Sequence, residues 1–243
     1  MKLGITRVRN EEVILQSTLD RLKPHLDGVI AFDDASNDST MDILTGDPFV
    51  IGIMRNMTWA SDPKERMILE SSQRTSLYDF ALTQRPEWVL YFDADEHIYF
   101  DAIDWSSRYN YFFRLFDVYI TKEDQYKHFS EREMIGCEYR DIPMLFRPED
   151  VTRFYNRLPI GVGSCMMGGT VKHFGKGISV DHWEETCDYY INNLYEVGVT
   201  GETISDKWRK RKGKAIHTES DFGNPLIKWD ERYHDNKIKK LDQ

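Results

Sequence analysis

Residues 28–40 read Gly-Val-Ile-Ala-Phe-Asp-Asp-Ala-Ser-Asn-Asp-Ser-Thr, and the fold prediction starts from this stretch. Gly28–Phe32 is a continuous apolar run, which is typical of a strand buried on both faces of a sheet. Asp33 and Asp34 end the run, and Ala35–Thr40 carries the Asn, Asp and Ser residues that favour turns and helix caps. The stretch therefore predicts a buried strand, a polar turn and the start of a helix.

The same alternation continues on both sides. Upstream, Leu3–Val8 is apolar, Asn10 is a candidate N-cap, and leucines recur after it at helical spacing. Downstream the pattern predicts a short helix through Leu44, a strand at Phe49–Met54, a helix from Asp62 to about Gln84, and a strand at Trp88–Phe92. Strands that alternate with helices form right-handed crossovers. The sequence thus predicts an α/β protein with a mostly parallel central sheet and helices on both faces.

The second half of the chain is less regular. Its segments are a strand-like aromatic stretch at Tyr109–Ile120, a charged helix or loop at 121–150, a glycine-rich stretch at 158–178, and a helical pattern at Asp181–Val197. Neither an internal repeat nor a clear linker divides the chain. We therefore expect one domain over residues 1–204 and a basic C-terminal extension over 205–243. The domain consists of two halves, 1–100 and 101–204.

Composition and charge narrow the functional classes. The 243 residues are 40% hydrophobic, enough for a substantial core, and 32 Lys and Arg against 41 Asp and Glu leave a net charge of -9. Such an acidic chain is a poor partner for nucleic acid, because phosphate neutralisation needs a surplus of cations. Three cysteines without a CxxC pair argue against a disulfide framework. Since neither a signal peptide nor a transmembrane segment is predicted, we expect a cytoplasmic protein.

Polar side chains collect where the predicted strands end. These ends carry Arg9-Asn10, Asp33-Asp34, Arg55 and Asp93–Asp95. The carboxyl ends of parallel strands share one edge of the sheet, and α/β folds bind ligands there. We therefore expect these residues to line a ligand site.

Asp93-Ala94-Asp95 is the sharpest of these features. In an extended segment, residues two apart point to the same side, so both carboxylates can face one ion. Hard divalent cations such as Mg²⁺ and Mn²⁺ take oxygen ligands and bridge to substrate phosphates. A metal–diphosphate site is the preferred interpretation, and acids that cap the next helix or face water are the alternative.

Asp33 and Asp34 suggest contacts to the ligand itself. An acid after a strand accepts hydrogen bonds from a ribose or a nucleobase in dinucleotide-binding folds. The alternative is a polar turn that caps the next helix through Asp38 or Ser39, and both interpretations can hold together.

Three arginines, Arg7, Arg9 and Arg74, are candidates for phosphate binding, because the guanidinium fork matches phosphate oxygens. Arg9 leaves the first strand at the ligand edge. For Arg74, in the middle of a predicted helix, a solvated or salt-bridged side chain is the alternative.

Together, Thr6–Glu12, Asp33–Thr40 and Trp88–Glu96 resemble, in order and spacing, the nucleotide-sugar-dependent glycosyltransferases of the GT-A fold, family 2 type. The resemblance covers roughly the first hundred residues and is far more specific than any single motif. It implies a Rossmann-like GT-A fold in which the half 1–100 binds the nucleotide and the half 101–204 binds the acceptor and the metal.

The resemblance also implies roles for individual residues. Asp34 would contact the nucleobase, usually uracil, and Arg74 would lie near the diphosphate. Asp93 and Asp95 would hold the ribose and the metal, Mn²⁺ or Mg²⁺. The donor-binding set expected in the matching segments is Thr6, Arg7, Arg9, Glu11, Asp33, Asp34, Arg74, Asp93, Ala94 and Asp95.

The family often has a later His beside the metal, and Val171–Gly175 looks like that segment. His173 is therefore the candidate third metal ligand, and His182 is the less favoured one. A His satisfied within a glycine-bordered turn is the alternative.

Transfer in this family is typically inverting. An acceptor hydroxyl attacks the anomeric carbon while the nucleoside diphosphate departs, and a carboxylate takes the hydroxyl proton. The candidates for this base are Asp117, Glu138 and Asp141. Asp141 is favoured because it precedes the apolar run 142–146, which would place it at the entrance of a strand and facing the acceptor. An ordinary Asp–Arg surface pair is the alternative.

The basic segment Lys207–Lys214 has three interpretations. It is a solvated helix face, or a cover over the active site that neutralises the diphosphate through Lys214 or His217, or a peripheral contact with an anionic membrane. The ordered character of Asp221–Ile227, which follows, favours the cover.

The expected function is an inverting, metal-dependent glycosyltransferase of the hexosyl- or deoxyhexosyltransferase class. It would move a sugar from a nucleotide-sugar donor, preferably a UDP-sugar, to a hydroxyl of a glycan or glycoconjugate acceptor. A sugar nucleotidyltransferase is one alternative, but its usual glycine-rich loop is replaced by Arg7–Glu11. A non-catalytic carbohydrate- or nucleotide-binding protein of the same fold is the other.

Overall fold

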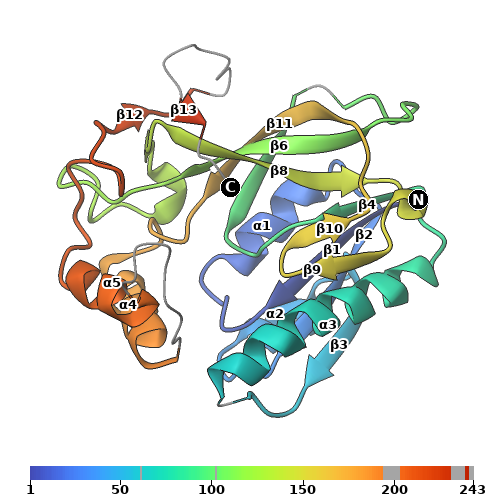
Figure 1. Ribbon diagram of the computed structural model, residues 1–243, viewed down its shortest axis with the longest axis horizontal. Helices are drawn as coiled ribbons and strands as arrows, with labels where there is room; N and C mark the ends of the chain where they lie inside the picture. The colour runs from blue at the N-terminus through green and yellow to red at the C-terminus, as the bar shows by residue number, and fades with distance from the viewer. Residues whose placement is uncertain (61, 102, 194–202, 231–238, 241–243) are drawn as a thin grey trace. The chain divides into compact units, whose positions relative to one another are not determined.

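The computed structural model describes residues 1–60, 62–101, 103–193, 203–230 and 239–240 (Figure 1). The helices are α1 Leu15–Leu22, α2 Thr40–Gly46, α3 Pro63–Leu82, α4 Val180–Asn193 and α5 Ile204–Arg211, with short 3₁₀ turns η1 Phe129–Glu131 and η2 Pro148–Asp150. The strands are β1 Lys2–Val8, β2 Gly28–Asp34, β3 Val50–Asn56, β4 Trp88–Tyr91, β5 Glu96–Phe100, β6 Asn110–Asp117, β7 Met134–Ile135, β8 Glu138–Phe146, β9 Arg153–Tyr155, β10 Leu158–Ile160, β11 Cys165–His173, β12 Ile227–Lys228 and β13 Lys239–Lys240. The predicted α/β class is confirmed.

The large sheet has the strand order β3-β2-β1-β4-β8-β6-β11-β5, and β13 pairs with β8. The first four strands are parallel, as their alternation with helices predicts. β8, however, runs antiparallel to β4, so the sheet is mixed. The prediction of a mostly parallel sheet therefore holds for β1–β4 but not for the sheet as a whole. The chain reaches β8 through β5, β6 and β7 instead of through a helical crossover after β4.

Helices cover both faces of the four parallel strands (Figure 1). Alternate residues of β2 point to opposite faces: Val29 and Ala31 belong to the core with α1 and α2, whereas Ile30 and Phe32 belong to the core with α3. All seven residues of β2 are buried. This burial on both faces explains why Gly28–Phe32 is a continuous apolar run.

Two local predictions were wrong. Asn10 does not cap α1, because it has a φ of 54° and its side-chain oxygen accepts the N–H of Asn37. The segment 121–150, predicted as a helix or loop, contains β8, because residues 138–146 fill the place between β4 and β6 in the sheet; the strand suggested after Asp141 is the second half of β8. The predicted cap of α3 is confirmed, since Asp62 accepts the N–H of Glu65 at 2.8 Å.

The chain divides into two compact units. Unit 1 comprises residues 1–60, 66–115 and 141–171, and unit 2 comprises 61–65, 116–140 and 172–243. Helices α4 and α5 belong to unit 2, as does the basic extension. The helix predicted at Asp181–Val197 is present as α4, and residues 194–197 lie outside the described residues. None of the described helices is long and apolar enough to span a bilayer.

Candidate functional site

The carboxyl ends of the first three strands meet at one edge of unit 1. Asp33 of β2 lies opposite Arg55 of β3. The next pair along the same two strands is Asp34 with Asn56. The polar strand ends identified in the sequence are therefore brought together, as a parallel sheet requires.

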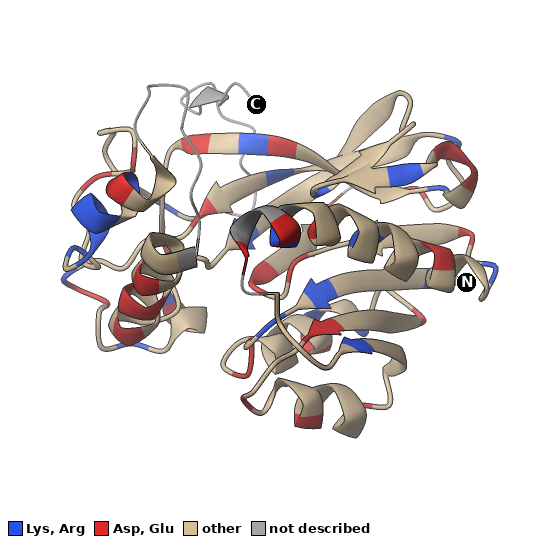
Figure 2. Ribbon diagram, turned by 60° about the horizontal axis from the view of Figure 1, so that its bottom comes forward, with Lys and Arg blue, Asp and Glu red and all other residues tan. Residues whose placement is uncertain are grey.

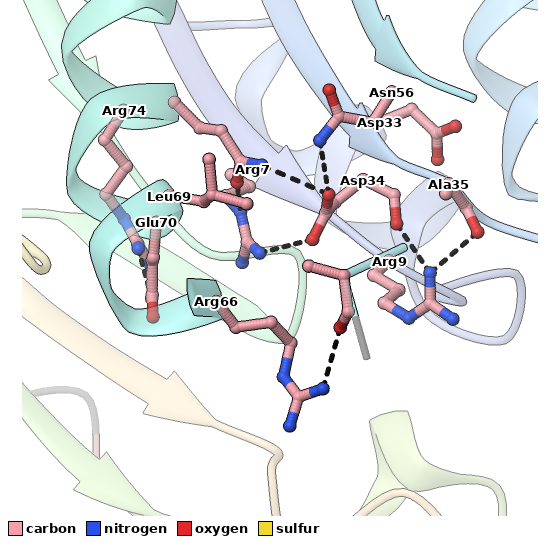
Figure 3. Close-up of polar contacts among 12 residues, drawn as sticks. Arg7, Arg9, Asp33, Asp34, Ala35, Asn56, Arg66, Leu69, Glu70 and Arg74 are labelled. Carbon is pink, nitrogen blue, oxygen red and sulfur yellow. Dashed lines mark hydrogen bonds and ion pairs between the residues drawn. The ribbon is translucent and has the colours of Figure 1, made fainter. Parts of the chain in front are cut away.

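Asp34 is held by side chains from three elements (Figure 3). Its carboxylate, in a residue that is 3% exposed, accepts hydrogen bonds from Arg7 of β1 at 2.5 Å and Asn56 of β3 at 2.8 Å. Gln73 of α3 donates a third at 3.3 Å. Arg7 also donates to the Gln73 side chain at 2.7 Å. These contacts fix the carboxylate in one orientation before any ligand arrives.

Arg9 forms hydrogen bonds with the backbone at the end of β2 (Figure 3). Its guanidinium donates to the carbonyls of Asp34 and Ala35, at 2.6 Å and 2.7 Å, and lies over the ring of Trp59. Ala35 has a φ of 57°, a left-handed conformation that costs a residue with a side chain roughly 1–2 kcal/mol. The Arg9 contacts are made to the two residues at which this strained turn begins.

Asp33 and Asp38 fit the alternative of a polar turn that leads into α2. The Asp33 carboxylate accepts the N–H of Ser36 at 3.2 Å and a hydrogen bond from Arg55 at 2.9 Å. Asp38 accepts the N–H of Thr40, the first residue of α2, at 3.0 Å. Of the two acids at the end of β2, Asp33 therefore shapes the turn.

Thr6 and Glu11 are two further residues of the predicted donor-binding set. Thr6 is fully buried within β1, so the structure does not support a contact of its side chain with the donor. Glu11 donates its backbone N–H to the Thr40 hydroxyl at 2.7 Å, which ties the segment after β1 to the start of α2.

At the end of β4, Asp93 lies between two arginines. Arg157 forms an ion pair with one carboxylate oxygen at 2.9 Å, and Arg74 approaches the other oxygen at 4.0 Å. Arg74 also pairs with Glu70 (Figure 3) and donates to the hydroxyl of Tyr91. The salt-bridged interpretation of Arg74 is therefore confirmed, and its partners place it beside Asp93.

Arg157 has a second acidic partner, Glu96. The Glu96 residue is fully buried, pairs with the Arg157 guanidinium and accepts the backbone N–H of Asp93 at 3.0 Å. Burial opposes the charge on both arginines, but neighbouring groups outweigh it. Tyr91, Asp93 and Glu70 raise the pKa of Arg74, and Asp93 and Glu96 raise the pKa of Arg157. Both guanidiniums are permanently charged.

The Asp93–Asp95 segment is not extended. β4 ends at Tyr91, and Ala94 and Asp95 lie in a turn that leads into β5. Ala94 is buried, and its carbonyl accepts the Thr18 hydroxyl at 2.5 Å. The argument from side-chain alternation was therefore wrong at this place, because the chain turns directly after β4.

A divalent cation remains compatible with this turn. Within the described parts of the chain, no group of three or more His, Cys, Asp or Glu side chains is arranged to hold a metal ion. Mg²⁺ and Mn²⁺ commonly use only one or two carboxylates and complete their shell with water and substrate phosphates. The predicted pair of oxygen ligands, Asp93 with its side chain 28% exposed and Asp95, stays a prediction.

In unit 2, Asp117 is the centre of a charged cluster. Its carboxylate contacts His173 Nδ1 at 2.6 Å, Arg140 at 2.6 Å and Lys176 at 2.7 Å. Burial opposes ionisation, but Lys176, His173 and Arg140 together hold the pKa of Asp117 well below its usual range. A carboxylate of such low basicity is a poor proton acceptor, which weakens Asp117 as the catalytic base.

The other two candidate bases have different surroundings. Asp141, in unit 1, pairs with Arg114 at 3.1 Å, so the Asp–Arg alternative is present there. Glu138, in unit 2, is 6% exposed and accepts hydrogen bonds from the Ser220 hydroxyl at 2.8 Å and the Asn224 amide.

The basic extension is partly neutralised within unit 2 (Figure 2). Lys212, directly after α5, pairs with Asp188 of α4, and Arg211 of α5 pairs with Asp221 at 2.6 Å. The Lys214 side chain is exposed to solvent. His217 packs between Tyr119 and Trp183, and burial lowers its pKa. The solvated-face interpretation suits these contacts, and the predicted diphosphate role of Lys214 stays a prediction.

His182 lies near the start of α4, where its backbone N–H donates to the Ser179 hydroxyl at 3.0 Å. The predicted metal roles of His173 and His182 stay predictions.

Sequence reasoning missed Arg157, Asn56 and Gln73. Asn56 is the last residue of β3 and follows Arg55, which the sequence places at a strand end, so the position of Asn56 could be predicted from the strand boundary. Arg157 follows Asn156, a turn-forming residue between two short apolar stretches, which is a hairpin signal. That signal predicts the hairpin but not the direction in which its tip points.

Comparisons with known proteins identify no family for the chain. No family model matches it. Uncharacterized protein Rv3786c of Mycobacterium tuberculosis and uncharacterized protein Mb3815c of Mycobacterium bovis are each 37% identical over 93 residues, which is 38% of this chain and 23% of the relative. The chain thus matches less than a quarter of the length of these relatives. The solved structure of HddC from Yersinia pseudotuberculosis aligns with 78% of this chain and 100% of its own at 10% identity, with a TM-score of 0.34, too low to support an argument.

Proposed function

We propose that the chain is an inverting, metal-dependent glycosyltransferase that binds a nucleotide sugar at the carboxyl edge of β1–β4. The observation that carries the proposal is the presence of two different polar clusters at this edge. Asp34 with its amide and guanidinium partners can meet a nucleobase or ribose, and the arginines beside Asp93 can meet a diphosphate. A nucleotide sugar carries both groups in one molecule.

Consecutive residues of α3 connect the two clusters. Gln73 contacts Asp34, and Arg74, the next residue, lies beside Asp93. Both are buried, at 7% and 6% exposure, so the helix fixes the two clusters relative to each other. A ligand that spans from the end of β2 to the end of β4 fits this arrangement better than a small anion does.

Asp93 and Asp95 are the residues that would hold the divalent cation. When bound, the cation supplies positive charge to the departing diphosphate. The chain's own contribution there is the charge of Arg74 and Arg157, which stabilises the same leaving group. Asp141 or Glu138 would take the proton from the acceptor hydroxyl.

Isothermal titration with UDP in the presence of Mn²⁺ tests the proposal. We expect the wild type to bind UDP, and Asp34→Ala to bind at least tenfold more weakly, because it loses an ionised acceptor. We also expect Asp95→Ala to weaken binding only when Mn²⁺ is present. Asp79→Ala, on the exposed face of α3, is the matched control and should bind as the wild type does.

Product analysis separates the enzyme classes. A glycosyltransferase releases UDP from a UDP-sugar, slowly to water and faster with an acceptor, whereas a binding protein releases none. Formation of a UDP-sugar and pyrophosphate from UTP and a sugar 1-phosphate would instead identify a nucleotidyltransferase. Absence of UDP binding, or equal affinity of the wild type and Asp34→Ala, would contradict the proposal.

A further inference from the structure

The β9–β10 hairpin carries Arg157 at its tip. Tyr155 of β9 pairs with Leu158 of β10, so that Asn156 and Arg157 form the two-residue turn. Asn156 has a φ of 47°, which asparagine tolerates better than most residues. The turn is fastened to α3, because the Ser71 hydroxyl accepts the Asn156 N–H at 2.9 Å. The hairpin therefore presents Arg157 to the end of β4 from a fixed position.

The guanidinium of Arg157 bridges two acids that differ in exposure. Glu96 is fully buried, whereas the Asp93 side chain is 28% exposed and reaches solvent. Arg157 itself has a side chain that is 20% exposed, and its buried Nε has no hydrogen-bond partner among the described residues. The hydrogen bonds of this guanidinium are thus incomplete, although its charge is balanced.

Asp93 is contacted from both sides by positive charge. Arg157 lies on Oδ2 at 2.9 Å, and Arg74 lies 4.0 Å from Oδ1. Arg157 contacts Oδ2, so a divalent cation that binds Asp93 through Oδ2, or through both oxygens, must share or replace the contact with Arg157. A guanidinium released from Asp93 remains within reach of any phosphate bound to that cation, and its planar fork suits phosphate oxygens.

We propose that Arg157 occupies the cation position on Asp93 in the donor-free protein and pairs with the diphosphate of the donor when a divalent cation takes that carboxylate. The inference rests on the proposed function. It adds that the β9–β10 hairpin holds the charge of Arg157 where it can pair first with Asp93 and then with the diphosphate. It predicts that Arg157 has opposite effects on two ligands. It hinders the binding of the metal alone and promotes the binding of the metal with a diphosphate.

The test measures both ligands on the same variants. Mn²⁺ alone is titrated by electron paramagnetic resonance, and UDP and inorganic pyrophosphate are titrated calorimetrically with Mn²⁺ present. For Arg157→Met we expect tighter binding of Mn²⁺ alone, and roughly 10- to 100-fold weaker binding of UDP and pyrophosphate, the usual effect of losing a charge-assisted hydrogen-bonded pair. Arg157→Lys keeps the charge without the fork and should give an intermediate loss.

Two controls separate this role from a structural one. Arg153→Met removes the same charge from an exposed position of the same hairpin and should change neither ligand. The double variant Glu96→Gln with Arg157→Met removes the buried carboxylate together with its partner and so restores charge balance in the core. If Arg157 only neutralises Glu96, the double variant regains wild-type UDP affinity. If Arg157 binds the diphosphate, the loss persists.

The outcomes are distinguishable from failure of the proposed function. Wild-type protein that binds no UDP with Mn²⁺ removes the proposed function and this inference with it. Wild-type protein that binds UDP, together with an Arg157→Met variant of unchanged UDP affinity, overturns the inference alone. Unchanged or weaker binding of Mn²⁺ to Arg157→Met, or recovery of UDP affinity in the double variant, also overturns it.

Discussion

Ala35 shows how one residue is strained to shape the site. Its φ of 57° allows its carbonyl and that of Asp34 to face Arg9. Glycine adopts this conformation freely, whereas a β-branched side chain does not. We expect Ala35→Val to lower the free energy of unfolding by about 1–3 kcal/mol, and Ala35→Gly to change it by less than about 1 kcal/mol. Urea denaturation of both variants checks this, and equal stability of the two would contradict it.

Which site residues the sequence reveals depends on how they are placed. Asp34 and Asp93 were found because they lie at the ends of buried strands, and the ends of parallel strands share one edge of the sheet. Gln73 and Arg157 could not be found in this way. Their positions depend on the rotation of α3 and on the direction of a hairpin, which tertiary packing decides and no local pattern records.

Among the described elements, α3 contributes a residue to each of the two clusters, and its N-terminus has a defined cap. Asp62 accepts the N–H of Glu65 at 2.8 Å, which satisfies one of the donors that a helix start leaves open. We expect Asp62→Ala to lower the free energy of unfolding by about 1 kcal/mol. The exposed Asp79→Ala on the same helix removes a charge without a cap and should have a smaller effect in the same urea titration. If both variants lower the free energy of unfolding equally, the loss is due to the removed charge and not to the missing cap.

The elements also show where sequence patterns are reliable. The strands β1 to β4 have apolar runs flanked by turn residues, and these were located to within a few residues. Only the second half of β8 was suggested by the sequence, because its first half, Glu138–Asp141, is charged and only its second half is apolar. A strand with such a mixed pattern is stabilised by its neighbours in the sheet, and those neighbours are far away in sequence.

For the whole molecule, buried titratable groups limit the pH range of stability. On the acid side, the pKa of Asp117 lies well below its usual range for the reasons given above, and that of Asp47 is lowered by Lys23, Gln16 and a backbone N–H despite burial. Groups whose pKa is lowered on folding stabilise the protein above their unfolded pKa of about 3.8. This stability is lost as the pH falls below that value.

At alkaline pH, Tyr78 makes the free energy of unfolding depend on pH in a way that can be tested. Burial raises its pKa to about 12, and its hydroxyl donates to the Pro148 carbonyl at 2.6 Å. Between pH 10 and this value the unfolded chain releases the tyrosine proton while the folded chain keeps it. The unfolded state then binds fewer protons, so the free energy of unfolding falls as the pH rises.

Lys176, whose pKa is raised by Asp117, Tyr119 and Asp221 against the effect of burial, contributes with the same sign, because its ion pairs are lost as the pH rises through its folded pKa. Urea denaturation of the wild type and of Tyr78→Phe at several pH values from 8 to 11 therefore separates the contribution of Tyr78 from that of Lys176. We expect the variant to be less stable at pH 8, because the buried hydrogen bond is missing, but to lose about 1 kcal/mol less than the wild type on going to pH 11. If the free energy of unfolding falls equally with pH in the two proteins, Tyr78 does not titrate differently in the folded and unfolded chains. The loss of stability at alkaline pH would then come from Lys176 and the other buried groups.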